Sequence, residues 1–154
     1  MGIYRIYEEM VIPASLDEVW NFISRPENLK EITPPSMGFH ITTPDLPSNM
    51  YPGMIISYKV SPILGIPMTW VTEITQIKEK AYFVDEQRIG PYAMWHHEHF
   101  VEETADGVKM TDIVSYKLPL GWLGRLGHRI MVRKQLKEIF LYRQKKLESI
   151  FGKA

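Results

Sequence analysis

The sequence predicts an α+β domain in which a curved antiparallel sheet of six to seven strands wraps around a long C-terminal helix. Three observations lead to this prediction. Residues 38 to 118 alternate apolar and polar side chains with the period of two that is typical of strands. Residues 128 to 151 change to helical spacing. The strand segments are joined by short links and must pair antiparallel, since a parallel pair needs a crossover of a dozen or more residues.

The N-terminal part is expected to begin with a strand and a short helix. Residues 3 to 12 alternate with period two and are rich in β-branched and aromatic types. Shortly after them, Ser15 stands three residues before Glu18, which is the spacing of a capping box. Apolar residues then follow at helical intervals, so a helix is predicted from about residue 16 to residue 24.

A second short helix and six further strands are expected before the C-terminal helix. Pro26 suits the first turn of this second helix, and Pro34 and Pro35 stop it because proline lacks the N–H donor. The Pro62-to-Pro67 stretch reads as a turn, and Asp106-Gly107 predicts a tight hairpin between two alternating segments. The expected strands are residues 39–43, 54–60, 68–77, 81–89, 93–103 and 108–118.

The last quarter of the chain is predicted to be one long amphipathic helix. Apolar residues recur every three or four positions between His128 and Phe151, while lysine and arginine largely occupy the other side. The apolar stripe requires burial, and the concave face of the sheet is the large apolar surface available to it. We therefore expect the helix to pack against the sheet.

The composition restricts the classes of partner. The 18 Lys and Arg residues balance the 18 Asp and Glu residues, so no broad field attracts nucleic acid or an anionic membrane. The absence of cysteine excludes disulfides, thiolate zinc sites and cysteine nucleophiles. No apolar run is long enough to span a bilayer. We expect a single domain over residues 1–154, located in the cytoplasm, without stable membrane insertion, and a homodimer is compatible with the sequence.

Three neighbouring predicted strands carry polar residues on the same face as apolar ones. Residues two apart on a strand share a face, so each face can be read directly from the alternation. If the three faces point inward, the interior holds two carboxylates, an amide, two imidazoles and a phenol, which a packed core tolerates only when they pair with one another. The faces comprise Phe83, Asp85 and Gln87, then Trp95, His97, His99 and Val101, then Met110, Asp112, Val114 and Tyr116.

Three interpretations of these polar residues stay open. They form a structural hydrogen-bond network, as buried polar groups usually do, or they line a pocket and orient an otherwise apolar ligand. In the third interpretation, His97 and His99 project side by side and bind a metal ion with Asp85, Asp112 or His128. The hypothesis carried forward is the ligand pocket, with no metal and no other cofactor.

Two other classes of function also stay open. A His-Asp pair such as His97 with Asp112 suits general acid–base catalysis, because imidazole titrates near neutral pH. No nucleophile elbow, phosphate-binding glycine loop or dinucleotide fingerprint occurs in the chain, so the catalytic candidates are His97, His99 and Asp112. The basic face of the C-terminal helix, which includes Lys134 and Lys137, is compatible with a protein-interaction module.

The predicted order of elements is one strand, two short helices, six strands and a long helix, and a set of residues along this order is similar to that of a known family. They are Phe83, Asp85, Gln87, Gly90-Pro91, Trp95, His97, His99, Met110-Thr111-Asp112, the segment 116–121, Phe140, Tyr142 and Arg143. Together they resemble the helix-grip fold of the START/Bet v 1-like (SRPBCC) superfamily over essentially the whole chain. The similarity is to an uncharacterised bacterial branch related to polyketide cyclase/dehydrase-like proteins.

The resemblance implies a cavity between sheet and helix that takes a hydrophobic molecule such as a lipid, sterol, polyketide or quinone. The expected function is the binding or carriage of such a molecule. Relatives elsewhere in the superfamily include aromatase/cyclases and dehydratases, so an enzyme using His97, His99 and Asp112 as acid/base groups remains the alternative. The residues expected to line the site are Trp70, Phe83, Asp85, Gln87, Trp95, His97, His99, Asp112, Tyr116, Trp122, Leu136 and Phe140.

Overall fold

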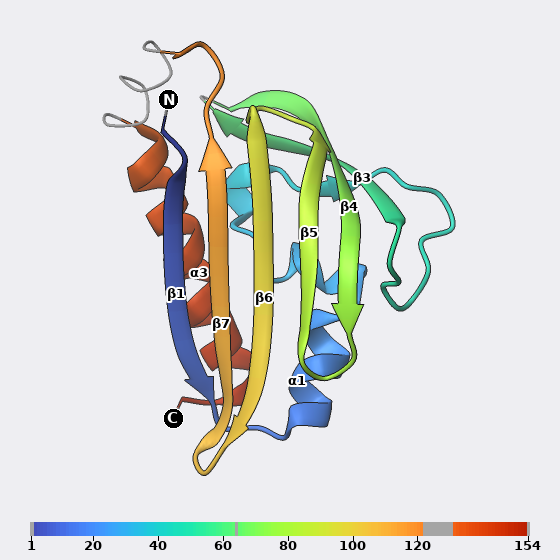
Figure 1. Ribbon diagram of the computed structural model, residues 1–154, viewed down its shortest axis with the longest axis vertical. Coiled ribbons are helices and arrows are strands. Elements are labelled where there is room, and N and C mark those ends of the chain that lie inside the picture. The colour runs from blue at the N-terminus through green and yellow to red at the C-terminus, as the bar shows by residue number, and fades with distance from the viewer. Residues whose placement is uncertain (1, 64, 122–130, 154) are drawn as a thin grey trace.

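A computed structural model describes residues 2–63, 65–121 and 131–153. Within these residues, seven strands form one antiparallel sheet in the order β1-β7-β6-β5-β4-β3-β2 (Figure 1). The strands are β1 (Tyr4–Ile12), β2 (His40–Ile41), β3 (Met54–Ile63), β4 (Ile66–Lys78), β5 (Tyr82–Ile89), β6 (Met94–Thr104) and β7 (Gly107–Lys117). The helical elements are α1 (Leu16–Ile23), the 3-10 helices η1 (Pro26–Lys30) and η2 (Pro35–Met37), and α3 (Arg133–Phe151).

This architecture confirms the predicted α+β fold class and the order of its elements. Both α1 and α3 lie behind the sheet in the view of Figure 1, with α3 next to β1 and β7. The predicted helix over residues 16–24 ends at Ile23, and α3 begins at Arg133, directly after two residues, 131–132, in π-helical conformation. No helix among the described residues is both long and apolar enough to cross a membrane.

The structure adds to or differs from the prediction at two proline segments. η1 ends at Lys30, before Pro34 and Pro35, and Pro35 in addition opens η2, where its fixed φ suits the first turn. The Pro62-to-Pro67 stretch is not a free turn, since β3 continues to Ile63 and pairs there with Ile66. The pairing register shifts between Val60 and Ile63, and such an irregularity is where a sheet accepts proline.

The sequence of α1 explains both its start and its orientation. The Ser15 hydroxyl oxygen accepts a hydrogen bond from the backbone N–H of Glu18 at 3.3 Å. The Glu18 carboxylate in turn accepts one from the backbone N–H of Ser15 at 2.9 Å, so the predicted capping box is confirmed. With its start fixed in this way, α1 buries Val19, Trp20 and Ile23 against the sheet.

The hairpin between β6 and β7 is tight because Gly107 begins the second strand. Thr104 pairs with Gly107, so only Ala105 and Asp106 lie between the strands, one residue earlier than the predicted Asp106-Gly107 turn. Gly107 has a φ of +124°, and a Cβ at this position would overlap the backbone carbonyl oxygen of Ile12. Only glycine permits this close approach of the hairpin to the end of β1.

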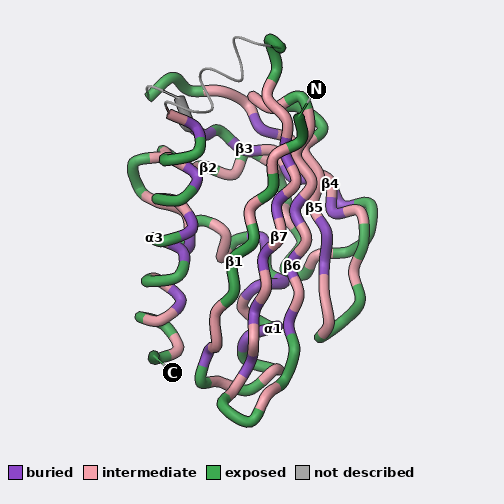
Figure 2. Tube along the Cα trace, turned by 60° about the vertical axis from the view of Figure 1, so that its left-hand side comes forward, coloured by how far each residue is buried: buried purple, intermediate pink, exposed green. Residues whose placement is uncertain are grey.

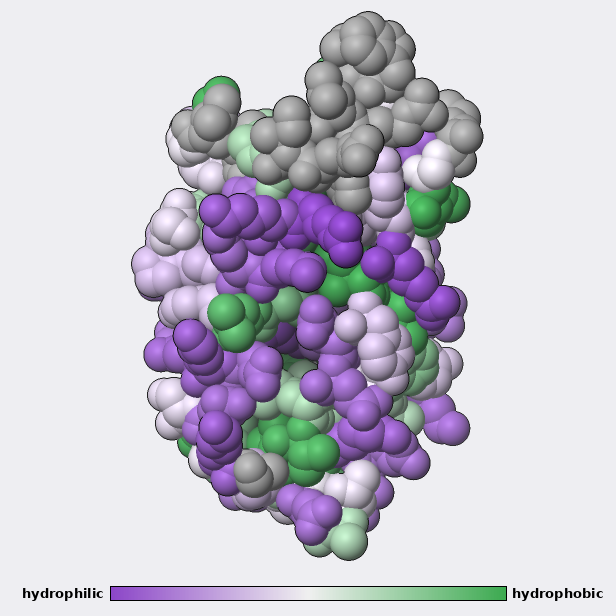
Figure 3. All heavy atoms as spheres, turned by 90° about the vertical axis from the view of Figure 1, so that its left-hand side faces the viewer, coloured by the Kyte–Doolittle hydropathy of each residue, from purple (hydrophilic) through white to green (hydrophobic). Residues whose placement is uncertain are grey.

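The buried positions follow the two periods expected of strand and helix (Figure 2). Every second residue of β7 from Val108 to Tyr116 is buried. In α3 the buried residues are spaced by three or four positions, and they are Leu136, Phe140, Arg143 and Leu147. Figure 3 shows the face that carries β1 and α3, where hydrophilic side chains cover most of the surface between scattered apolar ones.

The buried residues form three apolar clusters. The first, here called the basal cluster, joins α1 and the C-terminal end of α3 to the sheet, and its members are Ile12, Val19, Trp20, Ile23, Ile32, Phe83, Val101, Val108, Met110 and Leu147. The second comprises Met54, Ile56, Tyr58, Val60, Trp70 and Ile74. The third comprises Val114, Tyr116, Val132, Leu136 and Phe140.

Candidate functional site

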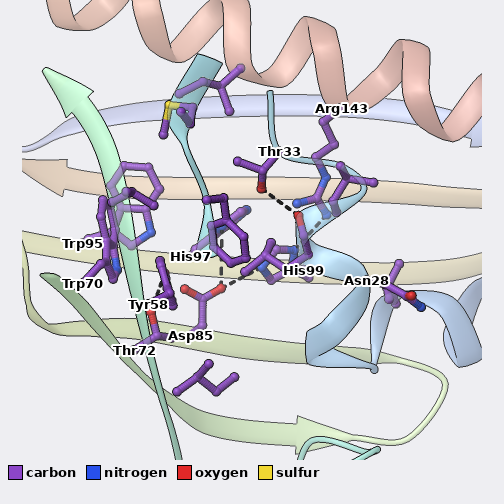
Figure 4. Close-up of a pocket in the computed structure, with 18 of the residues that line it drawn as sticks. Asn28, Thr33, Tyr58, Trp70, Thr72, Asp85, Trp95, His97, His99 and Arg143 are labelled. Atoms are coloured by element: carbon purple, nitrogen blue, oxygen red, sulfur yellow. Dashed lines mark hydrogen bonds and ion pairs between the residues drawn. The ribbon is translucent and has the colours of Figure 1, made fainter. Parts of the chain in front are cut away.

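A cavity of about 160 Å³ lies between the sheet and α3 (Figure 4). Strands β3 to β6 supply one wall, and α1, η1, η2 and α3 supply the others. The wall is mostly apolar and rich in rings, with Phe22, Phe39, Tyr58, Trp70, Phe83, Tyr92, Trp95 and Phe140. Such a lining suits an apolar or aromatic guest.

Strand register brings a group of polar side chains to one end of this wall. Asp85 of β5 lies directly opposite His97 of β6, and His99 lies directly opposite Asp112 of β7. Directly opposite residues in an antiparallel pair project from the same face of the sheet. Arg143 of α3 reaches toward them from the other side of the interior (Figure 4). These five residues are called the polar cluster below.

The carboxylate of Asp112 is the hub of the polar cluster. Its Oδ1 lies 3.1 Å from His97 Nε2, 2.7 Å from His99 Nδ1 and 3.2 Å from Arg143 Nη2. The second carboxylate, Asp85, has its Oδ2 2.8 Å from His99 Nε2. Arg143 Nη2 also lies 3.3 Å from His99 Nδ1. Because His99 Nδ1 lies closer to Asp112 Oδ1, at 2.7 Å, the Asp112 carboxylate is the partner of the His99 ring and also of the guanidinium.

These contacts set the charges in the cluster. Burial disfavours ionisation of Asp112, but the Arg143 charge and the hydrogen bonds from both histidines outweigh it and hold the pKa of Asp112 well below its usual range. Burial also disfavours a charged His99, yet hydrogen bonds to Asp112 and Asp85 outweigh burial and raise the pKa of His99. Both nitrogens of the His99 ring lie within 2.8 Å of a carboxylate oxygen.

His97 has the opposite electrostatic character. Burial, reinforced by the charge of His99, lowers the pKa of His97 to about 4. Since ionised Asp112 only accepts hydrogen bonds, the contact at His97 Nε2 requires the hydrogen on that nitrogen. The other nitrogen, Nδ1, then carries a lone pair, and it lies 3.7 Å from Asp85 Oδ2, too far for a hydrogen bond.

Two buried N–H groups have no acceptor among the described residues. They are the indole Nε1 of Trp70 and the Nε of Arg143. Both residues line the cavity, Trp70 in the aromatic wall and Arg143 as a member of the polar cluster. Because more than nine in ten buried polar groups in proteins are hydrogen-bonded, two such donors on one cavity are informative.

The structure places most of the residues predicted to line the site in the wall of the cavity. The cavity wall contains Trp70, Phe83, Asp85, Trp95, His97, His99, Leu136 and Phe140. Asp112 lies outside the wall, as the partner of both histidines. Trp122 lies outside the described residues.

Gln87 and Tyr116 were also predicted to line the site, and neither is in the wall. The side chain of Gln87 is held in the β5–β6 connection instead, because it donates to the backbone carbonyl of Tyr92 and accepts from its N–H. Tyr116 is 2% exposed and packs its ring against Tyr4 and Trp95. Inward-facing side chains thus divide between the wall, the core and a turn.

Sequence reasoning missed several residues of the wall, and Arg143 is the most consequential. It was assigned to the solvated basic side of the C-terminal helix, but it is 8% exposed. A signal was available, since Arg143 follows Phe140 by three positions and precedes Leu147 by four, on the apolar stripe. Thr72 was missed although it lies two residues from Trp70 on the same face of β4. Tyr58 was missed because its place opposite Trp70 depends on strand register, and Tyr92 because it lies in the link between β5 and β6.

Comparisons with known proteins identify the fold. No protein-family model matches the sequence, and none of the curated proteins compared with it is similar. Solved structures match nearly the whole chain. CV1439 from Chromobacterium violaceum has a TM-score of 0.71 at 12% identity, covering 97% of this chain and 99% of that one. The ginseng major latex-like protein 151 from Panax ginseng has a TM-score of 0.69 at 14% identity, covering 97% of both chains.

TTHA0849 from Thermus thermophilus is a third match, with a TM-score of 0.67 at 16% identity and 95% of both chains covered. The chain has the helix-grip fold. The predicted START/Bet v 1-like resemblance is therefore confirmed for the architecture. At identities this low, structural similarity shows the fold but not the function.

Proposed function

We propose that the chain binds a small, largely apolar molecule that carries a hydrogen-bond acceptor. The observation that carries this proposal is the pair of buried donors, Trp70 Nε1 and Arg143 Nε, on residues of the cavity wall, both without an acceptor in the described part of the chain. A buried N–H left without a partner costs roughly 1 to 3 kcal/mol. A carbonyl or hydroxyl oxygen of a guest removes that cost.

The volume of the cavity favours a guest of one or two rings. An apolar cavity of about 150 Å³ accepts benzene, whereas sites for drug-sized ligands run from about 300 to 1,000 Å³. At about 160 Å³ the cavity belongs to the smaller class. Of the ligand classes that the fold suggests, a quinone or an aromatic polyketide fragment fits this volume better than a sterol or a full-length lipid.

The aromatic wall favours a flat guest. Trp70, Tyr92 and Trp95 form a triangle of rings whose centroids are 4.8 to 5.6 Å apart. Aromatic rings prefer offset-stacked or edge-to-face contacts at such separations, each worth about 0.5 to 1.5 kcal/mol beyond the area buried. An aromatic guest adds such contacts to this triangle.

The enzymatic alternative uses His97, His99 and Asp112 as acid/base groups. Its support is that both imidazoles reach the cavity wall. The contacts within the polar cluster weigh against it, because both nitrogens of His99 lie within 2.8 Å of a carboxylate and Asp112 is outside the wall. Alanine at His97 must abolish turnover of a polyketide-like substrate in a folded protein if this alternative is correct.

A matched pair of probes tests the binding proposal. 1,4-Naphthoquinone has carbonyl acceptors, and naphthalene has the same fused rings without them. Calorimetric titration is expected to show binding of both, with the quinone bound more tightly. Trp70→Phe removes the indole donor and is expected to weaken quinone binding about tenfold, the equivalent of one hydrogen bond, while naphthalene affinity stays within twofold.

Trp20→Phe is the control for this experiment. Trp20 is also buried, at 7% exposure, but it belongs to the basal cluster and is absent from the cavity wall. Both affinities should therefore be unchanged. Failure of either probe to bind, or equal losses for both probes in Trp70→Phe, would contradict the proposal. Native mass spectrometry of the purified protein would reveal a retained guest directly.

A further inference from the structure

Three donor atoms of the polar cluster converge on one point. Asp85 Oδ2 lies 2.8 Å from His99 Nε2 and 3.7 Å from His97 Nδ1, and Asp85, His97 and His99 each offer one ligand atom within 4.8 Å of the other two. In a tetrahedral zinc site with bonds of 2.0 to 2.1 Å, neighbouring donor atoms are about 3.3 Å apart. The two distances from Asp85 Oδ2 lie on either side of that value, so small side-chain rotations bring the donors to bonding distance.

The opposite nitrogens of the two imidazoles meet a single carboxylate. His97 Nε2 is 3.1 Å and His99 Nδ1 is 2.7 Å from Asp112 Oδ1. Metal-binding histidines almost always donate their second N–H to such a group, which fixes the ring and its tautomer. Asp112 therefore directs His97 Nδ1 and His99 Nε2 toward Asp85. Arg143, at 3.2 Å, compensates the charge of Asp112.

The strand geometry suits this arrangement. His97 and His99 are two apart on β6, and their ring centroids are 3.7 Å apart. Asp85 is supplied by the neighbouring strand, directly opposite His97. The three side chains thus come from paired strands inside the sheet, and such rigid elements hold ligands more accurately than loops do.

We propose that Asp85, His97 and His99 bind one divalent transition-metal ion, with Asp112 and Arg143 as positioning residues. Imidazole ligands favour zinc, iron, copper or nickel ions, whereas magnesium and calcium prefer sites built from oxygen alone. All three ligand residues are in the cavity wall, so a further coordination position faces the guest. Three protein ligands with an open position are typical of reactive rather than structural zinc sites.

The test uses tag-free full-length protein. Metal analysis of protein from metal-replete cells should find close to one zinc or iron ion per chain. After chelator treatment, titration with Co²⁺ should produce visible absorption that saturates at one equivalent, and Zn²⁺ should displace it. His97→Ala and His99→Ala should each weaken Co²⁺ binding at least about 100-fold. Asp112→Asn should weaken it about 10- to 100-fold, as expected when the partner of a ligand is changed.

His96→Ala is the matched control. His96 lies on the same strand immediately before His97, but it faces the other side of the sheet and pairs with Glu86 at 2.7 Å. Its loss should leave Co²⁺ binding unchanged. Circular dichroism establishes that each variant is folded. For any alanine variant that fails to fold, Asp85→Asn, which keeps the shape of the side chain, replaces it and should abolish the increase in melting temperature that Zn²⁺ gives the wild type.

Two results would overturn the metal site. One is wild-type protein that neither retains a metal nor binds Co²⁺ near stoichiometry. The other is Co²⁺ binding that is equally strong in folded Asp85→Asn, His97→Ala and His99→Ala proteins. Titrating the chelator-treated protein with naphthalene separates this inference from the proposed function, because the aromatic wall does not include a metal ligand. If naphthalene binds and no metal binds, the metal site is refuted and the proposed function is unaffected. If a metal binds and naphthalene does not, only the proposed function is refuted.

Discussion

The two ends of the interior are packed differently, although α3, β5 and β6 contribute to both. At the C-terminal end of α3, Leu147 is 0% exposed within the basal cluster. Two to three turns earlier on the same helix face, Leu136 and Phe140 border the cavity. Tight packing in the basal cluster therefore holds the C-terminal end of α3 against the sheet. The preceding part of the helix borders the cavity instead of filling it.

The polar cluster marks the boundary between these two regions. On the basal side, Phe83 stacks on His99 with ring centroids 4.1 Å apart. On the cavity side, the rings of Phe140 and His97 meet edge to face at 5.9 Å. The charged groups are therefore enclosed by apolar rings from both regions, and their mutual contacts are their main source of stabilisation.

Removing the charge at this boundary is expected to have the largest effect on stability. Arg143→Leu leaves the Asp112 carboxylate buried without its guanidinium partner, which typically costs roughly 3 to 5 kcal/mol. Urea denaturation followed by circular dichroism measures the free energy of unfolding. Lys137→Leu, an exposed change on the same helix, should stay within about 0.5 kcal/mol. Equal effects of the two substitutions would show that Arg143 is not engaged with Asp112.

Two leucine truncations on α3 compare the regions directly. Leu147→Ala creates a void in the basal cluster and should cost about 3 to 4 kcal/mol. Leu136→Ala should cost about 2 kcal/mol, because that side chain already borders open space and loses fewer contacts. The same denaturation experiment measures both values. A cost for Leu136→Ala as large as that for Leu147→Ala would mean that both halves of α3 are packed alike.

The smallest expected effect concerns the attachment of α1 to the basal cluster. Ser15→Ala removes the hydroxyl acceptor of the capping box and should cost about 1 kcal/mol. Ser15→Asp retains a capping oxygen and should recover most of that loss. Quinone binding should be unaffected in both variants, since the cap lies outside the cavity wall. A change in binding without a change in stability would link α1 to the cavity more closely than its packing indicates.

Local sequence patterns predicted the elements well where the signal involves only neighbouring residues. The capping box of Ser15 and Glu18 placed the start of α1, and alternation along β6 correctly put His97 and His99 on one face. Local patterns failed at Pro62, where pairing across the hairpin extends the strand. They also failed at Arg143, whose charge predicts a solvent-exposed side chain. The side chain is instead buried and paired with Asp112.

The sequence by itself determined which side chains share a strand face and which helix is amphipathic, because both properties follow from the geometry of one element. Only the tertiary structure decided that Asp85 meets His97, that Asp112 contacts both imidazoles, and that Arg143 reaches them. Those contacts depend on strand register and on the position of α3 over the sheet. Both arise from packing between segments far apart in the chain, and no local spacing encodes them.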